Sequence, residues 1–120
     1  MREKIIPAPL PNDTSEPPEE IFRALAKWER NILSHSPGHV ALSRAFVEFL
    51  PGSISVLGKH IIIPLGEIMK IRRGDNFLWR GVVKVDLKAD IDGRQCYIFF
   101  LGGKRQKFLS SCQDLGIPVA

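Results

Sequence analysis

The chain has 120 residues, of which 44% are hydrophobic and 25% are charged, and its net charge is +4. These values exclude a disordered chain and predict one globular domain, and no apolar run reaches the roughly 18 residues of a transmembrane helix. Residues 1–20 carry a net charge of −3 and residues 21–120 a net charge of +7, so the body of the protein favours anionic partners.

The N-terminal segment, residues 1–17, holds four of the nine prolines and shows neither a helical nor an alternating apolar period. We therefore expect a flexible or extended tail. The prolines also interrupt its apolar residues before they reach the length of a signal peptide. On this basis we expect a cytoplasmic protein whose contact with a membrane is peripheral.

Residues 18–34 have the pattern of an amphipathic helix. Apolar side chains recur at positions i, i+4, i+7 and i+11, namely Ile21, Leu25, Trp28 and Ile32. Paired prolines and glutamates stand where they suit the first turn of a helix. We predict an α-helix over residues 18–34 as the first element of a single domain, residues 18–120. It should end before Pro37, because a proline disfavours helical geometry in the residue that precedes it.

Beyond this point the apolar period changes to two, which predicts strands. Residues 39–43 and 46–50 are short candidates, closed by Pro51-Gly52. Residues 61–71 form a longer apolar run in which Pro64 and Gly66 predict an edge strand, a bulge or a break near Pro64. The alternation is clearest over residues 80–89, where three positions should point inward: Val83, Val85 and Leu87.

Asp92-Gly93 predicts a two-residue type I′ hairpin turn, because both positions of that turn need positive φ. With this turn Leu87 would face Ile98, whereas with a three-residue bulged loop it would face Tyr97, and both registers stay open. The next strand, residues 96–101, is apolar on both faces, so its outer face needs a cover. We expect the helix of residues 18–34 to provide it.

The last element has the helical period again, with Gly116 in the position of a left-handed residue after the helix. Gly102-Gly103-Lys104-Arg105 precedes it. This stretch is either an anion-binding helix N-terminus, formed by Gly103, Lys104 and Arg105, or a tight corner between strand and helix. We favour the corner, because Arg105 stands where a P-loop has Ser or Thr.

Helix, antiparallel strands and a closing helix make an α+β order. The matching residues of a known family are PGHVALS at 37–43, FVEF at 46–49, IPLGEIMKI at 63–71 and YIFF at 97–100. On these residues the chain resembles the pleckstrin-homology-like (PH-like) superfamily, and within it the bacterial PH and GRAM-like domains. The resemblance implies a bent seven-stranded antiparallel β-barrel closed by the C-terminal helix. It also implies a non-catalytic module that binds phosphoinositides, peptides or proteins. Phosphoinositide-binding members place several basic residues in the first strand loop, where this chain offers only Arg44.

Six basic residues on the predicted strands form the candidate binding surface: Lys70, Arg72, Arg73, Arg80, Lys84 and Lys88. If the segment between the strands is a hairpin, they can share one face, which would suit an anionic lipid surface or an acidic protein partner. The alternative is an ordinary solvated strand face. Trp79 beside them belongs either to the core or to an exposed interface.

Other classes of function find less support. No nucleophile and base pair, no P-loop and no cofactor motif is present, so we expect neither an enzyme nor a cofactor. His35 and His39 have a metal-site spacing without further ligands, and Cys96 and Cys112 lie in apolar patterns that favour reduced thiols over a single bridge. A protein-interaction or homo-oligomerisation domain is the main alternative. A nucleic-acid-binding barrel that stacks bases on Phe77, Trp79 and Tyr97 is less favoured.

Overall fold

The computed structural model describes residues 19–31, 34–52, 59–75 and 79–120. These ranges contain seven strands: β1 (Glu20–Asn31), β2 (Ser34–Ser43), β3 (Phe46–Pro51), β4 (Ile61–Pro64), β5 (Ile68–Arg73), β6 (Val82–Ile91) and β7 (Arg94–Phe100). Single 3-10 turns, η1 (Leu65–Glu67) and η2 (Gly102–Lys104), precede β5 and the helix α1 (Arg105–Asp114). The expected tail of residues 1–17 and the predicted stacking residue Phe77 lie outside the described residues.

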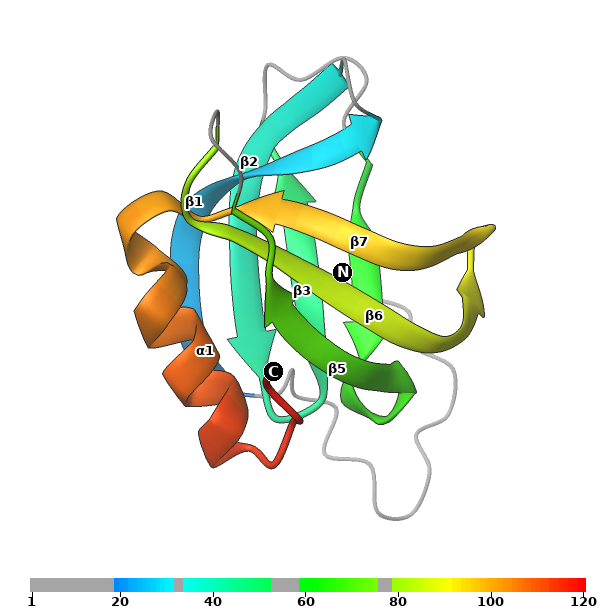
Figure 1. The fold of residues 1–120 in the computed structure, drawn as a ribbon, viewed down its shortest axis with the longest axis vertical. Helices are drawn as coiled ribbons and strands as arrows, with labels where there is room; N and C mark the ends of the chain where they lie inside the picture. Colours follow the sequence, from blue (N-terminus) through cyan, green and yellow to red (C-terminus); the bar gives the residue numbers. More distant parts are fainter. Residues whose placement is uncertain (1–18, 32–33, 53–58, 76–78) are drawn as a thin grey trace, which may run out of the picture.

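The strands form one antiparallel sheet in the order β4-β3-β2-β1-β7-β6-β5. β1 pairs with β2 over nearly its whole length but with β7 only at Lys27 and Trp28. The sheet therefore bends at this seam, and Figure 1 shows β5, β6 and β7 crossing in front of the other strands, with α1 along one side. This architecture confirms the α+β class, the bent antiparallel sheet and the C-terminal helix.

The predicted N-terminal helix is wrong, because residues 20–31 form β1. The segment carries two apolar periods at once. A helix would bury Leu25, which is 73% exposed, whereas the strand buries Phe22, Ala24, Ala26 and Trp28 at alternate positions. Pairing with β2 along nearly the whole of β1, and with β7 at Lys27 and Trp28, satisfies many of its backbone groups and overrides the helical pattern.

The boundary between elements expected before Pro37 is also wrong, because Pro37 and Gly38 both lie inside β2. Gly38 faces the interior, where a Cβ atom would come within 2.2 Å of the Leu50 carbonyl oxygen. Its missing side chain thus lets two strands approach closely. The predicted strands at 39–43 and 46–50 are confirmed, and β3 ends at Pro51 as expected.

The predicted break at Pro64 is confirmed, since β4 ends there and η1 separates it from β5. β4 and β5 are the two edges of the sheet. The C-terminal residues cover part of the β5 edge: Ile71 donates to the Pro118 carbonyl and accepts from Ala120, both at 2.9 Å. This short parallel bridge ties the end of the chain to the sheet.

The Asp92-Gly93 turn is confirmed, with φ of 53° and 78° and with Ile91 paired to Arg94. Both registers proposed for the rest of the hairpin are wrong, because Val85 faces Tyr97. An irregularity in β6 between Asp86 and Ile91 shifts the pairing beyond the turn. Such a shift is set by packing of the sheet rather than by the turn.

The core lies between the two halves of the sheet and α1. Phe22 of β1 meets Phe108 of α1 with their ring centroids 5.5 Å apart, and Cys112 is fully buried in the same core. The helix ends as predicted: Gly116 has φ of 84° and donates to Gln113, while Ile117 donates to Cys112. Both cysteines are free thiols. Burial raises the pKa of the Cys112 thiol to about 12, which makes it a structural residue.

Candidate functional site

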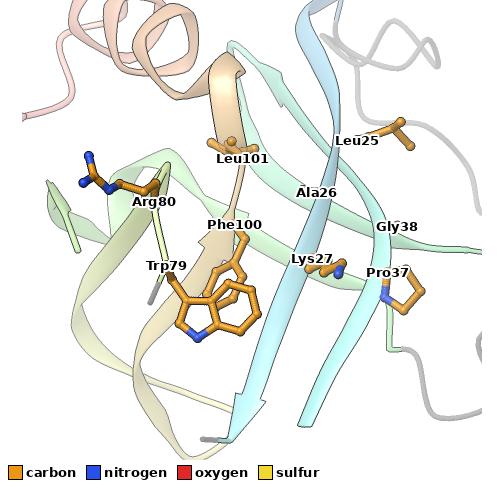
Figure 2. Close-up of a pocket in the computed structure, with 10 residues that line it drawn as sticks. Leu25, Ala26, Lys27, Pro37, Gly38, Trp79, Arg80, Phe100 and Leu101 are labelled. Carbon is orange, nitrogen blue, oxygen red and sulfur yellow. The ribbon is translucent and has the colours of Figure 1, made fainter. Parts of the chain in front are cut away.

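A cleft of about 480 Å³ opens where β1, β2 and β7 meet the segment that precedes β6. It is lined by residues 25–27 of β1, 37–38 of β2, 79–80 and 100–102. We call it the aromatic cleft. Figure 2 shows Trp79 lying against Phe100, with Lys27 and Pro37 across from them. The lining is mostly apolar, and the charged residues among its described members are two cations, Lys27 and Arg80.

Two rings, those of Trp79 and Phe100, line the aromatic cleft, and a third, that of His35, packs against both of them. The Trp79 ring centroid is 4.9 Å from that of Phe100 and 5.4 Å from that of His35, and His35 lies 4.8 Å from Phe100. Trp79 and His35 pack against Phe100 on the outer face of β7, and residues 20–31 form a strand, so the expectation that a helix covers this face is wrong. Trp79 is 39% exposed and Phe100 only 9%. Trp79 is therefore neither a core residue nor a free one, and its partly exposed ring lines the cleft.

The backbone holds the Trp79 segment close to the end of β7. Gly81 has φ of 71°, and its carbonyl accepts a hydrogen bond of 2.8 Å from the Leu101 amide. A Cβ atom on Gly81 would lie 2.4 Å from backbone atoms of Gly102. Only glycine fits this contact, because both the positive φ and the space exclude a side chain. The two segments that form the cleft are thus joined directly.

A second contact ties the same segment to α1. The Asp75 carboxylate accepts a 3.1 Å hydrogen bond from the Val82 amide and pairs with the Arg105 guanidinium. The hydrogen bond from the backbone, with a smaller one from Arg105, lowers the pKa of the Asp75 carboxyl, while desolvation opposes them. Arg105, proposed above as an anion ligand, is engaged by Asp75.

The corner at the start of α1 has the geometry of a tight turn. Gly102 has φ of 58°, Lys104 donates its amide to Leu101, and both Gly103 and Lys104 are exposed to solvent. Three positive residues, Lys104, Arg105 and Lys107, stand at the N-cap and in the first turn of α1 without an acidic one. The predicted anion site at Gly103, Lys104 and Arg105 therefore stays a prediction, and the glycines are explained by the corner.

Three of the six predicted basic residues lie together on the outer face of β5 and β6. Arg72 is paired in register with Lys84, and Lys70 with Asp86. We call Lys70, Arg72 and Lys84 the basic strip. Lys84 also faces Ile98 of β7, two residues from Phe100, so the basic strip runs toward the aromatic cleft. Arg80 lies at the cleft itself.

An acidic residue reduces the charge of the basic strip. Asp86 is buried, and its carboxylate oxygens lie 2.6 Å and 3.2 Å from Nε and Nη2 of Arg72. The hydrogen bonds from Arg72 lower the pKa of the Asp86 carboxyl, while desolvation opposes them. Burial, and next the hydrogen bond with Asp86, raise the pKa of the neighbouring Cys96 thiol to about 11. Arg72 is thus a structural partner of Asp86.

The other two predicted residues lie elsewhere. Arg73 donates from Nη2 to the Gln106 side chain of α1 at 2.8 Å, so it turns toward the helix. Lys88 is exposed on β6 beyond the point where the pairing with β5 ends. Three of the six predicted residues therefore lie together on β5 and β6, and the prediction that all six share one binding surface stays a prediction.

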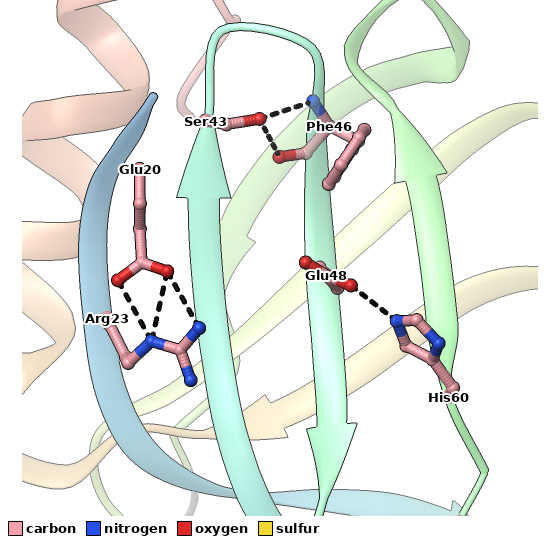
Figure 3. A network of polar contacts seen from close by, with 6 residues as sticks. All are labelled: Glu20, Arg23, Ser43, Phe46, Glu48 and His60. Atoms are coloured by element: carbon pink, nitrogen blue, oxygen red, sulfur yellow. Dashed lines mark hydrogen bonds and ion pairs between the residues drawn. The ribbon is translucent and has the colours of Figure 1, made fainter. Parts of the chain in front are cut away.

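A second hollow, of about 410 Å³, lies on the outer face of β1, β2 and β3 and is lined by both acidic and basic residues. We call it the paired groove. Its Arg23 donates to both oxygens of Glu20 at 2.7 to 3.0 Å, and its Glu48 pairs with His60, as Figure 3 shows. The hydrogen bonds from Arg23 lower the pKa of the Glu20 carboxyl. The charged side chains that line this groove are therefore already paired, Arg23 with Glu20 and Glu48 with His60.

Arg94 forms a further cationic contact near the β6–β7 turn. Its guanidinium lies 5.2 Å from the Trp28 ring centroid and 6.0 Å from that of Tyr97, and it donates to the Arg30 carbonyl. Arg30 in turn donates to Ser34 at 2.8 Å. These arginines hold neighbouring strands together.

The sequence did not identify Lys27, which lines the cleft, or His35, which packs against the two rings of the cleft, as site residues. Lys27 stood on the polar side of the expected helix, and His35 was considered only as a metal ligand beside His39. Within the described ranges no three His, Cys, Asp or Glu residues gather as they would around a metal ion. The same residues include no helix long and apolar enough to cross a membrane.

No protein-family model and no curated protein sequence matches this chain. Solved structures do. The C-terminal domain of an unknown protein from Leishmania infantum aligns with a TM-score of 0.65 at 13% identity, over 82% of this chain and 84% of that one. The Slm1-PH domain in complex with inositol-4-phosphate aligns with a TM-score of 0.56 at 14% identity, over 80% and 94%.

The DH/PH domains of p115-RhoGEF align with a TM-score of 0.60 at 12% identity, over 88% of this chain but only 30% of that longer chain. At these identities the likeness concerns the fold and not the ligand. Seven antiparallel strands in a bent sheet, a closing C-terminal helix and alignment to two different PH domains agree with one another. The chain therefore has the fold of the PH-like superfamily.

Proposed function

We propose that this protein is a non-catalytic binding module that docks on an anionic lipid surface through the aromatic cleft and the adjoining basic strip. The observation that carries the proposal is the combination at the cleft of two cations, Lys27 and Arg80, with two exposed apolar side chains, Leu25 and Trp79. Tryptophan suits the boundary between headgroups and acyl chains, and lysine and arginine suit anionic headgroups.

The charge balance supports the same surface. Within the described part of the chain, neither Lys27 nor Arg80 has an acidic group at ion-pair distance, and the cleft lining contains no carboxylate. Each basic side chain near an anionic leaflet contributes about 1 kcal/mol at ordinary salt. Lys27, Arg80, Lys70 and Lys84 together would therefore give useful, salt-sensitive binding. The Slm1-PH domain, which has a similar fold, has been solved in complex with inositol-4-phosphate, which is an anionic ligand.

Sedimentation with phosphatidylserine vesicles and with neutral phosphatidylcholine vesicles, at low and at moderate salt, tests the proposal. We expect binding to the anionic vesicles only. Replacing Lys27 and Arg80 together by Ala should remove about 2 kcal/mol, which is a roughly thirtyfold loss of affinity. Lys70→Ala with Lys84→Ala should weaken binding as well if the basic strip takes part.

The matched control replaces two exposed cations outside the cleft and the basic strip, Arg44→Ala with Lys107→Ala. It removes the same charge, so an equal loss of binding would show that only net charge matters. Failure of the unmodified protein to bind anionic vesicles at low salt would overturn the proposal. Binding to an oligonucleotide or to a protein partner in place of vesicles would support the alternative classes of function.

A further inference from the structure

The N-terminal segment contains the sequence IPAPLP at residues 6–11, in which every residue is a proline or directly precedes one. Proline holds its own φ near −65°, and the residue before a proline is confined to extended geometry. A segment of this kind favours the polyproline II conformation before it binds anything. Prolines 7, 9 and 11 have no N–H group, so the segment is a poor partner for a sheet edge and a good one for an aromatic surface.

The aromatic cleft has the character of a surface that receives such a segment. Trp79 and Phe100 present a pair of rings 4.9 Å apart, and Pro37 lies across from them. Flat aromatic rings pack well on pyrrolidine rings, and binding a stiff segment orders few torsions. Lys27 and Arg80 on the same cleft can donate hydrogen bonds to the exposed carbonyl groups of a polyproline II segment.

The length of the chain before β1 permits this contact. Eight residues connect Pro11 to Glu20, where β1 begins, and they can span at most roughly 26 to 29 Å. The path along β1 from Glu20 to Leu25 is about 17 Å and to Lys27 about 23 Å. The segment at residues 6–11 can therefore reach the cleft of its own chain.

Charge supports the same placement. The connecting residues 12–19 contain three acidic residues and no basic one, namely Asp13, Glu16 and Glu19. The described lining of the cleft contains two cations and no acidic residue. Complementary charges of this kind favour one occupant over others of similar shape.

We propose that residues 6–11 of this chain dock in its own aromatic cleft, as a polyproline II segment packed on Trp79 and Phe100. A docked segment would cover the ring that the membrane proposal requires to be open, so it would compete with the lipid surface. The inference concerns the same cleft but does not depend on lipid binding, because the contact lies within one chain.

The test uses the full chain in solution NMR. We expect nuclear Overhauser effects between the Trp79 indole protons and ring protons of Pro7, Pro9 or Pro11. Replacing these three prolines together by Gly should abolish these effects and shift the amide resonances of Lys27 and Gly102. The matched control, Pro17→Gly with Pro18→Gly, changes the same residue type outside residues 6–11 and should leave these resonances in place.

Dilution over a tenfold range identifies the occupant. Overhauser effects that persist unchanged support docking within one chain, whereas their disappearance on dilution would show that a second copy fills the cleft and would overturn the proposal. Their absence in the unmodified protein would overturn it too. If the protein also binds phosphatidylserine vesicles, the triple variant should bind them several-fold more tightly than the control. This vesicle result tests competition, while the NMR result stands whether or not vesicles bind.

Discussion

The aromatic cleft and the paired groove both lie on the outer surface of the sheet, yet their charges are arranged in opposite ways. In the groove, Arg23 is bound by Glu20, and Glu48 by His60. In the cleft, Lys27 and Arg80 line the same hollow as Trp79 and Phe100, with no carboxylate among the described lining residues. The two hollows have similar volumes, so size does not distinguish them.

The difference shows which hollow is better suited to a partner. A charge already paired at a surface gains little from a new partner, because it must first give up the old one. A cation beside an open apolar ring keeps its capacity to bind an anion or a carbonyl group. The pairing of charges therefore favours the aromatic cleft as the binding site and the paired groove as ordinary surface.

The largest expected effect comes from displacing the segment that carries Trp79, which forms one wall of the cleft. Gly81→Ala places a methyl group against the Gly102 backbone at a positive φ, so the segment with Trp79 must move. We expect a loss of about 2–5 kcal/mol in the free energy of unfolding, from backbone strain and overpacking together. Urea unfolding measures it. The control is Gly93→Ala, where φ is also positive but the space is open, and it should cost only about 1–2 kcal/mol. Equal losses would contradict the close contact.

The second prediction compares the loss of stability on removing Arg72, which pairs with Asp86, with the loss on removing its neighbour Lys84. Arg72→Ala leaves the buried Asp86 carboxylate without its guanidinium partner, whereas Lys84→Ala removes a half-buried cation. We expect Arg72→Ala to cost about 1–2 kcal/mol of stability, at the low end of its class because the Arg72 side chain is 40% exposed. Thermal unfolding compares the two variants. A larger loss for Lys84→Ala would refute the assignment of Arg72 as a structural residue.

The same pair predicts a dependence of stability on pH. Arg72 lowers the pKa of Asp86 in the folded protein, so the folded state holds the ionised form more firmly than the unfolded chain does. Its contribution is complete above the ordinary carboxyl pKa near 4 and is lost as the pH falls through the lower folded value. Asp86→Asn should flatten this acid limb in unfolding curves measured from about pH 6 to about pH 2. An unchanged limb would show that other carboxyls produce it.

A third comparison sets one cation of the cleft against one of the groove. Lys27→Ala should weaken binding to phosphatidylserine vesicles about fivefold, because it removes roughly 1 kcal/mol of attraction. Arg23→Ala removes the same charge from the same strand, but Arg23 already binds Glu20, so we expect little change. Vesicle sedimentation with both variants decides the matter. Equal losses would abolish the distinction between the two hollows.

The smallest expected effect concerns the contact between Arg105 and Asp75, which helps to fix the segment with Trp79. Arg105→Ala releases Asp75 and one of the contacts that fix the segment with Trp79, while the Gly81 contact stays. We expect an unchanged fold and a modest rise in acrylamide quenching of tryptophan fluorescence. Arg105→Lys should restore part of the protection, because it keeps a donor near Asp75. No change in quenching would show that the glycine contact alone positions Trp79.

Much of the fold follows from local patterns. The hairpin turn at Asp92-Gly93, the break at Pro64 and the helix end at Gly116 each depend on a few neighbouring residues whose backbone preferences are strong. The first strand did not follow in this way. Residues 20–31 satisfy a helical and a strand period together, and the choice depended on partners distant in the sequence.

The site was only partly predictable for the same reason. Trp79 and Arg80 drew attention by their residue types, but Lys27 and His35 join them only because β1 pairs with both β2 and β7. Arg72 and Arg73 carry the same charge in adjacent positions, yet one binds Asp86 and the other faces Gln106. Residue type alone predicted one basic surface, whereas the pairing of the strands gives its residues different neighbours.

The sequence alone was enough to predict the fold class, the Asp92-Gly93 turn, the helix end at Gly116 and the excess of positive charge on residues 21–120, because these depend on composition and on short-range backbone preference. Three features depended on the tertiary structure: residues 20–31 form a strand, the β6–β7 hairpin has its particular register, and some cations of the described residues line the aromatic cleft while others pair with a carboxylate. Those outcomes depend on pairing between residues far apart in the chain, whose energies no local pattern contains.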